Sequence, residues 1–264
     1  MIQCSLRSIL ATAFVAIVCL IQPTIASATS CSPSGSYSFI YPSGSAIYET
    51  NNPYGDEGDS TTGTCVVNTA VYAESNLAWY TQWNQPTGET YNVYSYPEAI
   101  FDNSYSYTNL PRTLSSITSI PSTWNYGLSA SDSTGYDVAY DVWVYPTSSA
   151  TGTPTAEVMI WTAANFGQDG TNVGTYTIDG IPFTLYQTLP ADYSWTTHPV
   201  YSFVAQNSVS YISGDLKQFL TTLTNNGYIS TSTYLTSIDV GVEVRGTSGT
   251  GSLSTYDYSV YVNY

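Results

Sequence analysis

The amino-acid sequence predicts an all-β protein, a sandwich or barrel that carries one helix. Short runs rich in Val, Tyr, Thr and Ile recur along the chain and are separated by clusters of Gly, Pro, Asn and Ser, a pattern typical of β-sandwiches and β-barrels. Only the segment 213–223 has the apolar spacing of an amphipathic helix. Without an N-terminal leader the chain holds roughly 235 residues, which suits a single domain.

The predicted strands are apolar or alternating runs bounded by turn residues. In chain order they are 36–40, 46–50, 65–72, 77–82, 91–96, 136–145, 156–162, 175–178, 181–186, 200–205, 236–245 and 253–262. Turns are expected at 52–55, 85–88, 179–180 and 246–251. Asp179-Gly180 is a strong tight-hairpin signal. The segment 146–155 indicates a long hairpin loop rather than a domain boundary.

The helix is predicted from apolar residues at 216, 219, 220 and 223, a spacing that gathers side chains on one helix face. Ser213 is a suitable N-cap, and Asp215 suits the positive end of the first turn. Gly227 is a natural stop. We therefore expect one helix on the outer face of a sheet.

Two predicted strands carry acidic residues on one face. Because side chains alternate along a strand, Glu157, Met159 and Trp161 share a face. On a second strand Glu243 and Arg245 share a face, and three valines take the other. The hypothesis is that Glu157 and Glu243 face each other and share acid/base work on a glycosidic bond. The alternative is an ordinary half-buried antiparallel sheet with one polar face.

The N-terminus predicts export. Arg7 precedes an apolar run over 9–21, and the A-x-A sequence at 26–28 follows, as in secretory signal peptides. We therefore expect 1–28 to be a signal peptide and 29–264 to be one exported domain. No later stretch is apolar and long enough to span a bilayer.

The cysteines and the single histidine limit the available chemistry. Cys31 and Cys65 remain beyond the signal peptide, and such a pair forms one disulfide in an oxidising compartment, with two free thiols as the alternative. His198 has no acidic residue beside it in the sequence. One histidine cannot supply a zinc site built on several His ligands.

The charge balance excludes some partners and favours others. Lys and Arg together number 4, against 19 Asp and Glu, so the chain lacks the basic patch that nucleic acid or an anionic membrane requires. With 26 Tyr and 6 Trp, it suits an uncharged partner that stacks on aromatic rings. A neutral polysaccharide has this character.

A set of short motifs, taken in order, points to a known family. The motifs are Asn52-Pro53-Tyr54-Gly55, Trp79 with Trp83, Ser95-Tyr96-Pro97, Glu157-Val158-Met159-Ile160-Trp161, the strand 200–205, the segment 213–217 and Gly241-Val242-Glu243. Together they resemble glycoside hydrolase family 12, the small endo-β-1,4-glucanases and xyloglucanases. The resemblance runs from about residue 31 to the C-terminus.

The resemblance implies a β-jelly roll sandwich of two curved antiparallel sheets, with one α-helix on the outer face and an open cleft that binds a neutral β-glucan. It implies retaining hydrolysis of internal bonds by a secreted monomer, with no cofactor and no metal. Such enzymes use two carboxyls about 5–5.5 Å apart. Glu157 matches the nucleophile, Glu243 the general acid/base and Asp141 an auxiliary carboxyl. The alternative for Asp141 is a turn or surface carboxylate.

The resemblance also implies a set of substrate-binding residues. They are Asn52, Tyr54, Trp83, Met159, Trp161 and Asn165. The aromatic rings among them would stack on the apolar C–H face of a sugar. Tyr54 stands where the family usually has Trp, so a weaker or differently shaped distal subsite is expected. For Trp79 we favour core packing.

The sequence departs from the family pattern in two places. After Glu243 the family usually has Pro and an aromatic residue, whereas this chain has Val244-Arg245. The region 194–199 also differs, which points to a remodelled acceptor side. Two rival interpretations stay open. One is a xylanase, against which Glu-Val-Met-Ile-Trp argues, and the other is a carbohydrate-binding protein that kept the fold and lost the chemistry.

Overall fold

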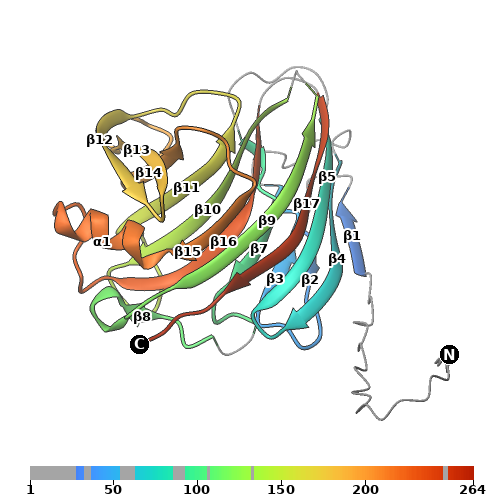
Figure 1. Cartoon of the computed structure of the whole chain (residues 1–264), viewed down its shortest axis with the longest axis horizontal. Coiled ribbons are helices and arrows are strands. Elements are labelled where there is room, and N and C mark those ends of the chain that lie inside the picture. Colours follow the sequence, from blue (N-terminus) through green and yellow to red (C-terminus); the bar gives the residue numbers. More distant parts are fainter. Residues whose placement is uncertain are drawn as a thin grey trace, which may run out of the picture.

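A computed structural model of the chain describes residues 28–32, 37–53, 63–85, 93–105, 108–131, 134–245 and 249–264. In this part of the chain two sheets pack face to face (Figure 1). The all-β sandwich with one α-helix that the sequence predicts is confirmed. No helix in these ranges is long and apolar enough to cross a membrane.

The smaller sheet has six strands. In spatial order they are β1 (Ala28–Ser32), β4 (Gly63–Ala73), β5 (Asn76–Gln85), β17 (Gly249–Val260), β9 (Pro121–Ala130) and β15 (Tyr211–Asp215). The sequence did not predict β9, whose run is interrupted by Asn125 and Gly127. It is nevertheless a central strand, because alternate residues such as Trp124 and Tyr126 are buried in the core.

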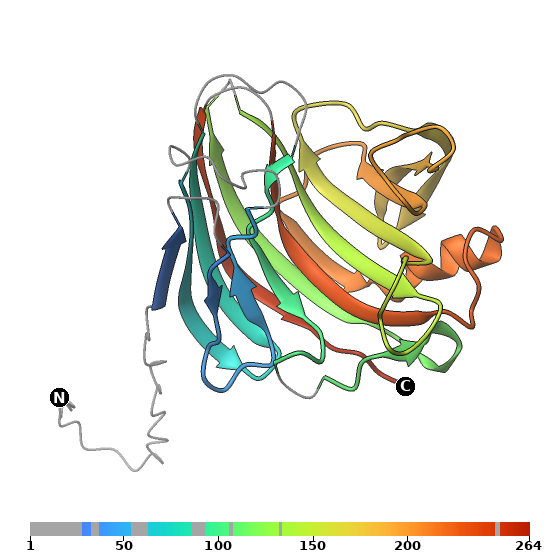
Figure 2. The ribbon, with the colours of Figure 1, turned by 180° about the vertical axis from the view of Figure 1, so that it is seen from behind.

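The larger sheet has eleven strands. Its main path is β12 (Thr171–Ile178), β13 (Ile181–Thr188), β14 (Val200–Ala205), β11 (Ala156–Ala164), β10 (Gly135–Tyr145), β16 (Tyr234–Arg245), β7 (Glu98–Phe101), β3 (Tyr48–Thr50) and β2 (Phe39–Ile40). Two short strands, β6 (Val93–Ser95) and β8 (Arg112–Thr113), also pair with β16. In Figure 2 the long strands β11, β10 and β16 curve side by side through the middle of this sheet.

One pair of neighbouring strands corrects the expectation of purely antiparallel sheets. β11 and β14 run parallel, with Glu157 aligned to Val200 and Trp161 to Val204. The chain reaches this arrangement because β12 and β13 form a hairpin between the two strands. The hairpin turn is Asp179-Gly180, as predicted, and both residues have positive φ, 48° and 81°.

The helix α1 (Lys217–Asn225) begins later than the sequence predicts. Ser213 and Asp215 belong to β15 instead, because that strand continues pairing with β9 up to Asp215. The carboxylate Oδ1 of Asp215 accepts hydrogen bonds from the backbone N–H of Lys217 (3.0 Å) and of Ile120 (2.6 Å). Gly227 follows the helix with φ +74°, as expected for a stop.

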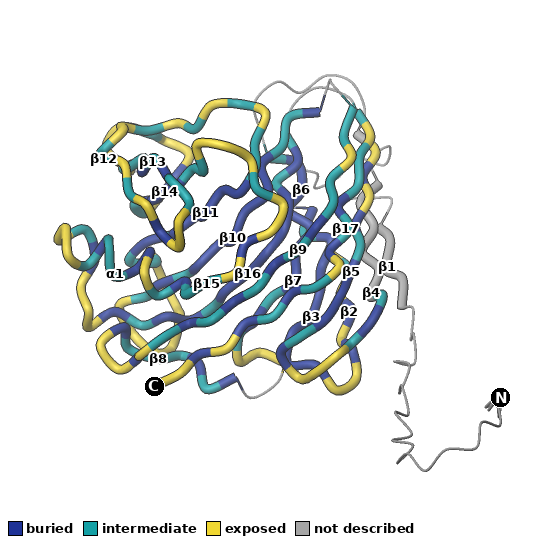
Figure 3. The backbone as a smooth tube through the Cα atoms, viewed as in Figure 1, coloured by how far each residue is buried: buried dark blue, intermediate teal, exposed yellow. Residues whose placement is uncertain are grey.

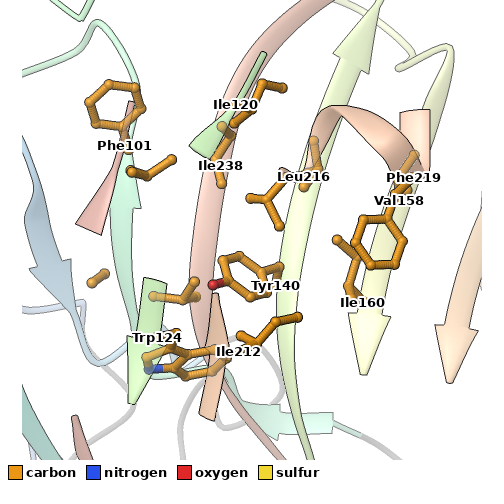
Figure 4. Close-up of a cluster of buried hydrophobic side chains, with 14 of the residues drawn as sticks. Phe101, Ile120, Trp124, Tyr140, Val158, Ile160, Ile212, Leu216, Phe219 and Ile238 are labelled. Atoms are coloured by element: carbon orange, nitrogen blue, oxygen red, sulfur yellow. The ribbon is translucent and has the colours of Figure 1, made fainter. Parts of the chain in front are cut away.

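The helix packs on the core side of the large sheet. The Phe219 ring contacts the rings of Phe183 on β13 and Phe203 on β14, with centroids 5.1 Å apart in both cases. Figure 4 shows Phe219 among the buried side chains of the core, which also include Val158 and Ile160 on β11. The sequence predicts the helix on the outer face of a sheet. In the structure it packs against β13 and β14 on the core side of the large sheet, where the smaller sheet, which ends at β15, does not reach.

The core lies between the two sheets and follows the alternation of the strands. On β10, Val138, Tyr140 and Val142 point into it, and on β11 Val158 and Ile160 do the same. The central strands are the most completely buried part of the molecule (Figure 3). Each buried aliphatic side chain contributes roughly 1.5–3 kcal/mol, so the opposite faces of these strands are held in fixed positions.

Gly251 lies in a tightly packed part of the smaller sheet, where a substitution can test the packing. It lies opposite Trp83 on β5, and a methyl group at this position would overlap the Trp83 indole and lie 2.8 Å from the carbonyl oxygen of Ser129. We expect Gly251→Ala to lower the free energy of unfolding by about 1–3 kcal/mol, as other overpacked cores do, measured by denaturant unfolding. Gly167→Ala is the matched control, because nothing lies within 4 Å of a methyl group there. Equal stability of the two variants would contradict this packing.

Candidate active site

The face of the large sheet that is turned away from the core carries a group of acidic side chains, and we call it the carboxyl face. Alternation along β10, β11 and β16 puts every second residue on it. Cross-strand register adds Glu98, which lies opposite Gly241. The acidic members are Glu98, Asp137, Asp141, Glu157, Asp239 and Glu243. The sequence predicted Asp141, Glu157 and Glu243 as site residues, and the structure places all three on this face.

Carboxyl groups oppose each other across β10 and β16 at two positions. Asp137 lies opposite Glu243, and Asp141 lies opposite Asp239. Between them Ala139 lies opposite Gly241, and the buried Tyr96 side chain packs over this middle position. Its hydroxyl donates to the carbonyl oxygen of Ala139 (3.1 Å), and a methyl group on Gly241 would lie 2.9 Å from its ring. Directly opposed like charges destabilise an antiparallel pair, and these pairs therefore require protons or cations.

Burial favours the protonated form of four of these groups. Asp137, Asp141, Asp239 and Glu98 are each at most 7% exposed. Desolvation raises the pKa of all four well above the ordinary range, and neighbouring carboxylates raise it further: Glu243 acts on Asp137, Glu157 on Asp141, and Asp239 on Glu98. The auxiliary position of Asp141 is thus a buried carboxyl beside Glu157, and not a surface carboxylate.

Glu157 is held by a histidine that the sequence analysis left without a partner. The Nε2 atom of His198 lies 3.1 Å from Oε2 of Glu157, and the two side chains are 13% and 15% exposed. The parallel pairing of β11 with β14 creates this contact, since the backbone N–H of Glu157 donates to the carbonyl oxygen of Pro199 (3.1 Å). Burial raises the pKa of Glu157, and the hydrogen bond from His198 opposes that rise.

Glu243 is held by Arg245. The Nη2 and Nε atoms of the guanidinium lie 2.6 Å and 3.1 Å from Oε2 of Glu243. Nε also lies 3.8 Å from Oδ2 of the fully buried Asp137. The two carboxyls that the sequence singled out therefore each have one basic partner.

Glu157 and Glu243 lie on the two strands that flank β10. Glu157 is opposite Trp143 and Glu243 is opposite Asp137, near the two ends of β10. Their side chains nevertheless act on each other, because the charge of Glu243 raises the pKa of Glu157. The arrangement supplies two interacting carboxyls on one face.

Two of the predicted sugar-stacking rings are buried, which corrects the sequence analysis. Trp161 is fully buried on the carboxyl face, where the Phe166 ring packs against it at 5.3 Å and its N–H donates to Sδ of Met159 (3.5 Å). Met159 is 4% exposed, so it lies beneath the surface of the face. Trp83 is 2% exposed and belongs to the core of the sandwich, as Trp79 does.

Trp143 is the partly exposed ring next to the site, and the sequence analysis did not select it as a binding residue. It lies opposite Glu157 and its ring is 5.5 Å from the ring of His198. Trp143 follows Asp141 by two residues on β10, and this spacing could have identified it as a residue of the same face.

Of the two asparagines predicted to bind substrate, one reaches the carboxyl face and the other holds a loop. Asn52 donates to Oε1 of Glu98 (2.6 Å) and so reaches the carboxyl face. Asn165 instead braces the loop after β11, because its amide donates to the carbonyl oxygen of Thr134 (2.6 Å) and accepts from the N–H of Tyr136 (2.8 Å). Both ends of the amide thus hold the loop, and the role of Asn165 as a substrate contact stays a prediction.

Some predictions fall outside the described residues. Tyr54 does, and so does the signal peptide up to residue 27. The register of β1 and β4 puts Cys31 opposite Cys65, and opposed Cα atoms in an antiparallel pair lie about 4.5–5.5 Å apart, a separation that a disulfide spans. The side chains of both cysteines lie outside the described residues, so the disulfide stays a prediction.

Comparison with known proteins identifies the family. Paired carboxyls on one face are the machinery of glycoside hydrolases, and residues 47–263 match glycosyl hydrolase family 12. This chain belongs to that family. It is 37% identical over 218 residues to the xyloglucan-specific endo-β-1,4-glucanase A of Aspergillus niger, covering 80% of this chain and 83% of the relative.

Other relatives and solved structures agree. The xyloglucan-specific endo-β-1,4-glucanase A of Aspergillus aculeatus is 34% identical, with 76% of this chain and 80% of the relative covered. The fold is similar to that of the Trichoderma harzianum endoglucanase 3, with a TM-score of 0.74, 28% identity, and 92% and 100% of the two chains covered. The fold is also similar to that of a family 12 xyloglucanase from Bacillus licheniformis, with a TM-score of 0.74 and 26% identity. The match covers 89% of this chain and 100% of that one.

The buried carboxyls predict a stability that falls with rising pH. In the unfolded chain these groups lose their protons near pH 4, whereas the raised pKa values keep them protonated in the folded state, so the folded state binds more protons and loses stability as pH rises through those values. We expect the melting temperature to decrease from about pH 4 to pH 7. Asp239→Asn should flatten this slope, and Asn in place of the exposed Asp192 should not. A rising melting temperature over this interval would contradict the assignment.

The contact with His198 predicts the direction of a pKa change at Glu157. His198→Leu removes the hydrogen bond that opposes the effect of burial, so the pKa of Glu157 should rise. Carbon NMR titration of the side-chain carboxyls measures it, with the signal assigned by its loss in Glu157→Gln. Tyr193→Leu serves as a control on the same loop. An unchanged or lowered pKa would show that His198 does not act on Glu157.

Proposed function

We propose that this protein is a secreted, retaining endo-β-1,4-glucanase, with xyloglucan as its first candidate substrate. The observation that carries the proposal is the pair Glu157 and Glu243, which lie on strands flanking β10, share one face and interact electrostatically. Xyloglucan is favoured over other β-1,4-glucans because the curated relatives named above are called xyloglucan-specific. Action outside the cell as a monomer follows from the predicted signal peptide and the family resemblance.

The reaction uses the two carboxyls in two steps. Ionised Glu157 attacks the anomeric carbon while Glu243 gives its proton to the departing glycosidic oxygen, and a glycosyl-enzyme ester forms. Glu243 then takes a proton from water, whose oxygen attacks the same carbon and releases Glu157. His198 supports the first step, because its hydrogen bond favours the ionised nucleophile.

Asp141 acts as the auxiliary carboxyl. It is 7% exposed, and Glu157 is the neighbouring charge that most raises its pKa. A protonated Asp141 carries no charge that would repel the ionised nucleophile. Its neutral form therefore lets Glu157 stay ionised in a buried site.

The substrate chain crosses the carboxyl face. Trp143 offers a partly exposed ring beside Glu157. At the far edge Phe39 lies opposite Thr50, which lies opposite Glu98, so Phe39 belongs to the same face. Exposed rings continue along this edge, because Phe39 stacks with Tyr37 at 6.3 Å and Tyr41 at 6.0 Å. These rings suit the apolar faces of successive sugars.

The decisive experiment compares purified wild type with Glu157→Gln on xyloglucan, mixed-linkage β-glucan, carboxymethylcellulose and xylan. Loss of the nucleophile should lower the release of reducing ends by about 10³-fold or more while polymer binding persists. Glu74→Gln is the matched control, since Glu74 is an exposed glutamate on a turn between β4 and β5. Proton NMR of the first product should show the β-anomer, as retention requires.

Each alternative has its own outcome. An α-anomer as first product would overturn the retaining mechanism, and activity on xylan alone would favour the xylanase. Polymer binding by a wild type that cleaves none of the four would favour the carbohydrate-binding protein. The contact of Arg245 with Glu243 is the observation that favours the carbohydrate-binding protein. A neighbouring cation stabilises the ionised form of a carboxyl, and an ionised Glu243 cannot act as a general acid.

A further inference from the structure

Arg245 holds one particular oxygen of Glu243. It follows Glu243 by two residues on β16, so both side chains project from the same face of the strand. Its Nη2 and Nε atoms both donate to Oε2 of Glu243, at 2.6 Å and 3.1 Å, whereas no described hydrogen bond from the guanidinium reaches Oε1. The guanidinium thus occupies the Oε2 side of the carboxyl, and the buried Asp137 is the other side chain that interacts with Glu243.

The guanidinium is itself fixed from several directions. It lies 4.5 Å from the centroid of the Phe166 ring and 5.7 Å from that of Trp161. Behind it, Oδ2 of the buried Asp137 is 3.8 Å from Nε. A planar cation between aromatic rings and two carboxyls has little freedom to turn, and the Arg245 side chain is 23% exposed.

We propose that Arg245 is a positioning residue that directs the transferable proton of Glu243 to Oε1. An arginine donates hydrogen bonds and accepts none, so a proton on Oε2 would face two N–H groups, and the acid form carries its proton on Oε1. In the first step the Oε1–H bond breaks and the proton goes to the glycosidic oxygen as its bond to the anomeric carbon breaks. In the second step Oε1 takes a proton from water. The inference rests on the proposed function, in which Glu243 is the general acid/base.

The charge of Arg245 has a second consequence, for the pH dependence of activity. The charged or titratable groups that act on the pair Asp137 and Glu243 or on Arg245 come from several elements. They are Glu157 on β11, Asp141 on β10, Asp169 in the loop after β11 and Tyr96 after β6, while His198 before β14 acts on Glu157. Arg245 is the cation in contact with the pair, and it favours loss of a proton from it. Removing the guanidinium should therefore make the pair hold its last proton to higher pH.

Two variants of Arg245 separate its charge from its geometry. Arg245→Gln removes the charge, and Arg245→Lys keeps a charge but not the two-donor fork. Arg112→Gln is the matched control, because the Arg112 guanidinium also lies on an aromatic ring, 3.7 Å from the centroid of Tyr264, and belongs to β8 rather than to the carboxyl face. Each is assayed over pH with xyloglucan oligosaccharides and with an aryl β-glycoside whose phenolate leaves without a proton.

Three results are expected. In Arg245→Gln the alkaline limb of kcat/KM moves up by about one pH unit, and kcat on the oligosaccharide falls about tenfold, whereas kcat on the aryl glycoside changes by less than about threefold, because only the first substrate needs the positioned proton. Arg245→Lys keeps the alkaline limb in place but shows the same loss on the oligosaccharide. Arg112→Gln matches wild type on both substrates.

Several results would overturn the inference. An alkaline limb that does not move in Arg245→Gln, or equal losses on the two substrates, would make Arg245 a packing residue only. A rise in kcat on the oligosaccharide would show that Arg245 obstructs the acid. If Arg245→Gln does not fold, Arg245→Met combined with Asp137→Asn removes the cation and its buried partner together and is judged by the same substrate ratio. A wild type that cleaves neither substrate would instead overturn the proposed function, and this inference with it.

Discussion

The opposition of carboxyl groups across β10 and β16 is the constraint on which the site depends. Asp137 faces Glu243 and Asp141 faces Asp239 on neighbouring strands, where two ionised groups would repel each other at short range. Burial does not allow water to screen this repulsion. The structure meets the constraint with protons on the more deeply buried groups and with a basic side chain on each of the two that are partly exposed, Glu157 and Glu243.

The same strands make the constraint unavoidable, because their other faces build the core. Val138, Tyr140 and Val142 lie between the sheets, and a slip of one residue in β10 would move them to the carboxyl face and its carboxyls into the core. The free energy of apolar burial therefore fixes the register, and the register fixes which carboxyls meet. Stability of the sandwich and geometry of the site are in this sense one property of the strand pattern.

Local alternation was enough to predict the shared face of Glu157 with Met159 and Trp161, and that of Glu243 with Arg245. It could not predict His198 as a partner of Glu157, since their contact depends on the parallel pairing of β11 with β14 across a long connection. Nor could it tell exposed from covered rings: Trp161 faces the predicted side, but Phe166 from the following loop covers it. The strand β9 was missed for a related reason, because Asn125 and Gly127 weaken its local signal while its neighbours β17 and β15 hold it in place.

Because basic residues are scarce in this chain, the contacts of His198 with Glu157 and of Arg245 with Glu243 are important for the site. The whole sequence has 4 Lys and Arg and 1 His, with a formal net charge of −15, so no general positive field balances the carboxyl face. Charges beyond roughly 8–10 Å are largely screened at physiological salt, and compensation must come from direct contacts. His198 and Arg245 supply these contacts to one oxygen each of Glu157 and Glu243. A basic side chain that binds a single oxygen leaves the other for substrate, so the residues that make the face stable also decide which atoms can react.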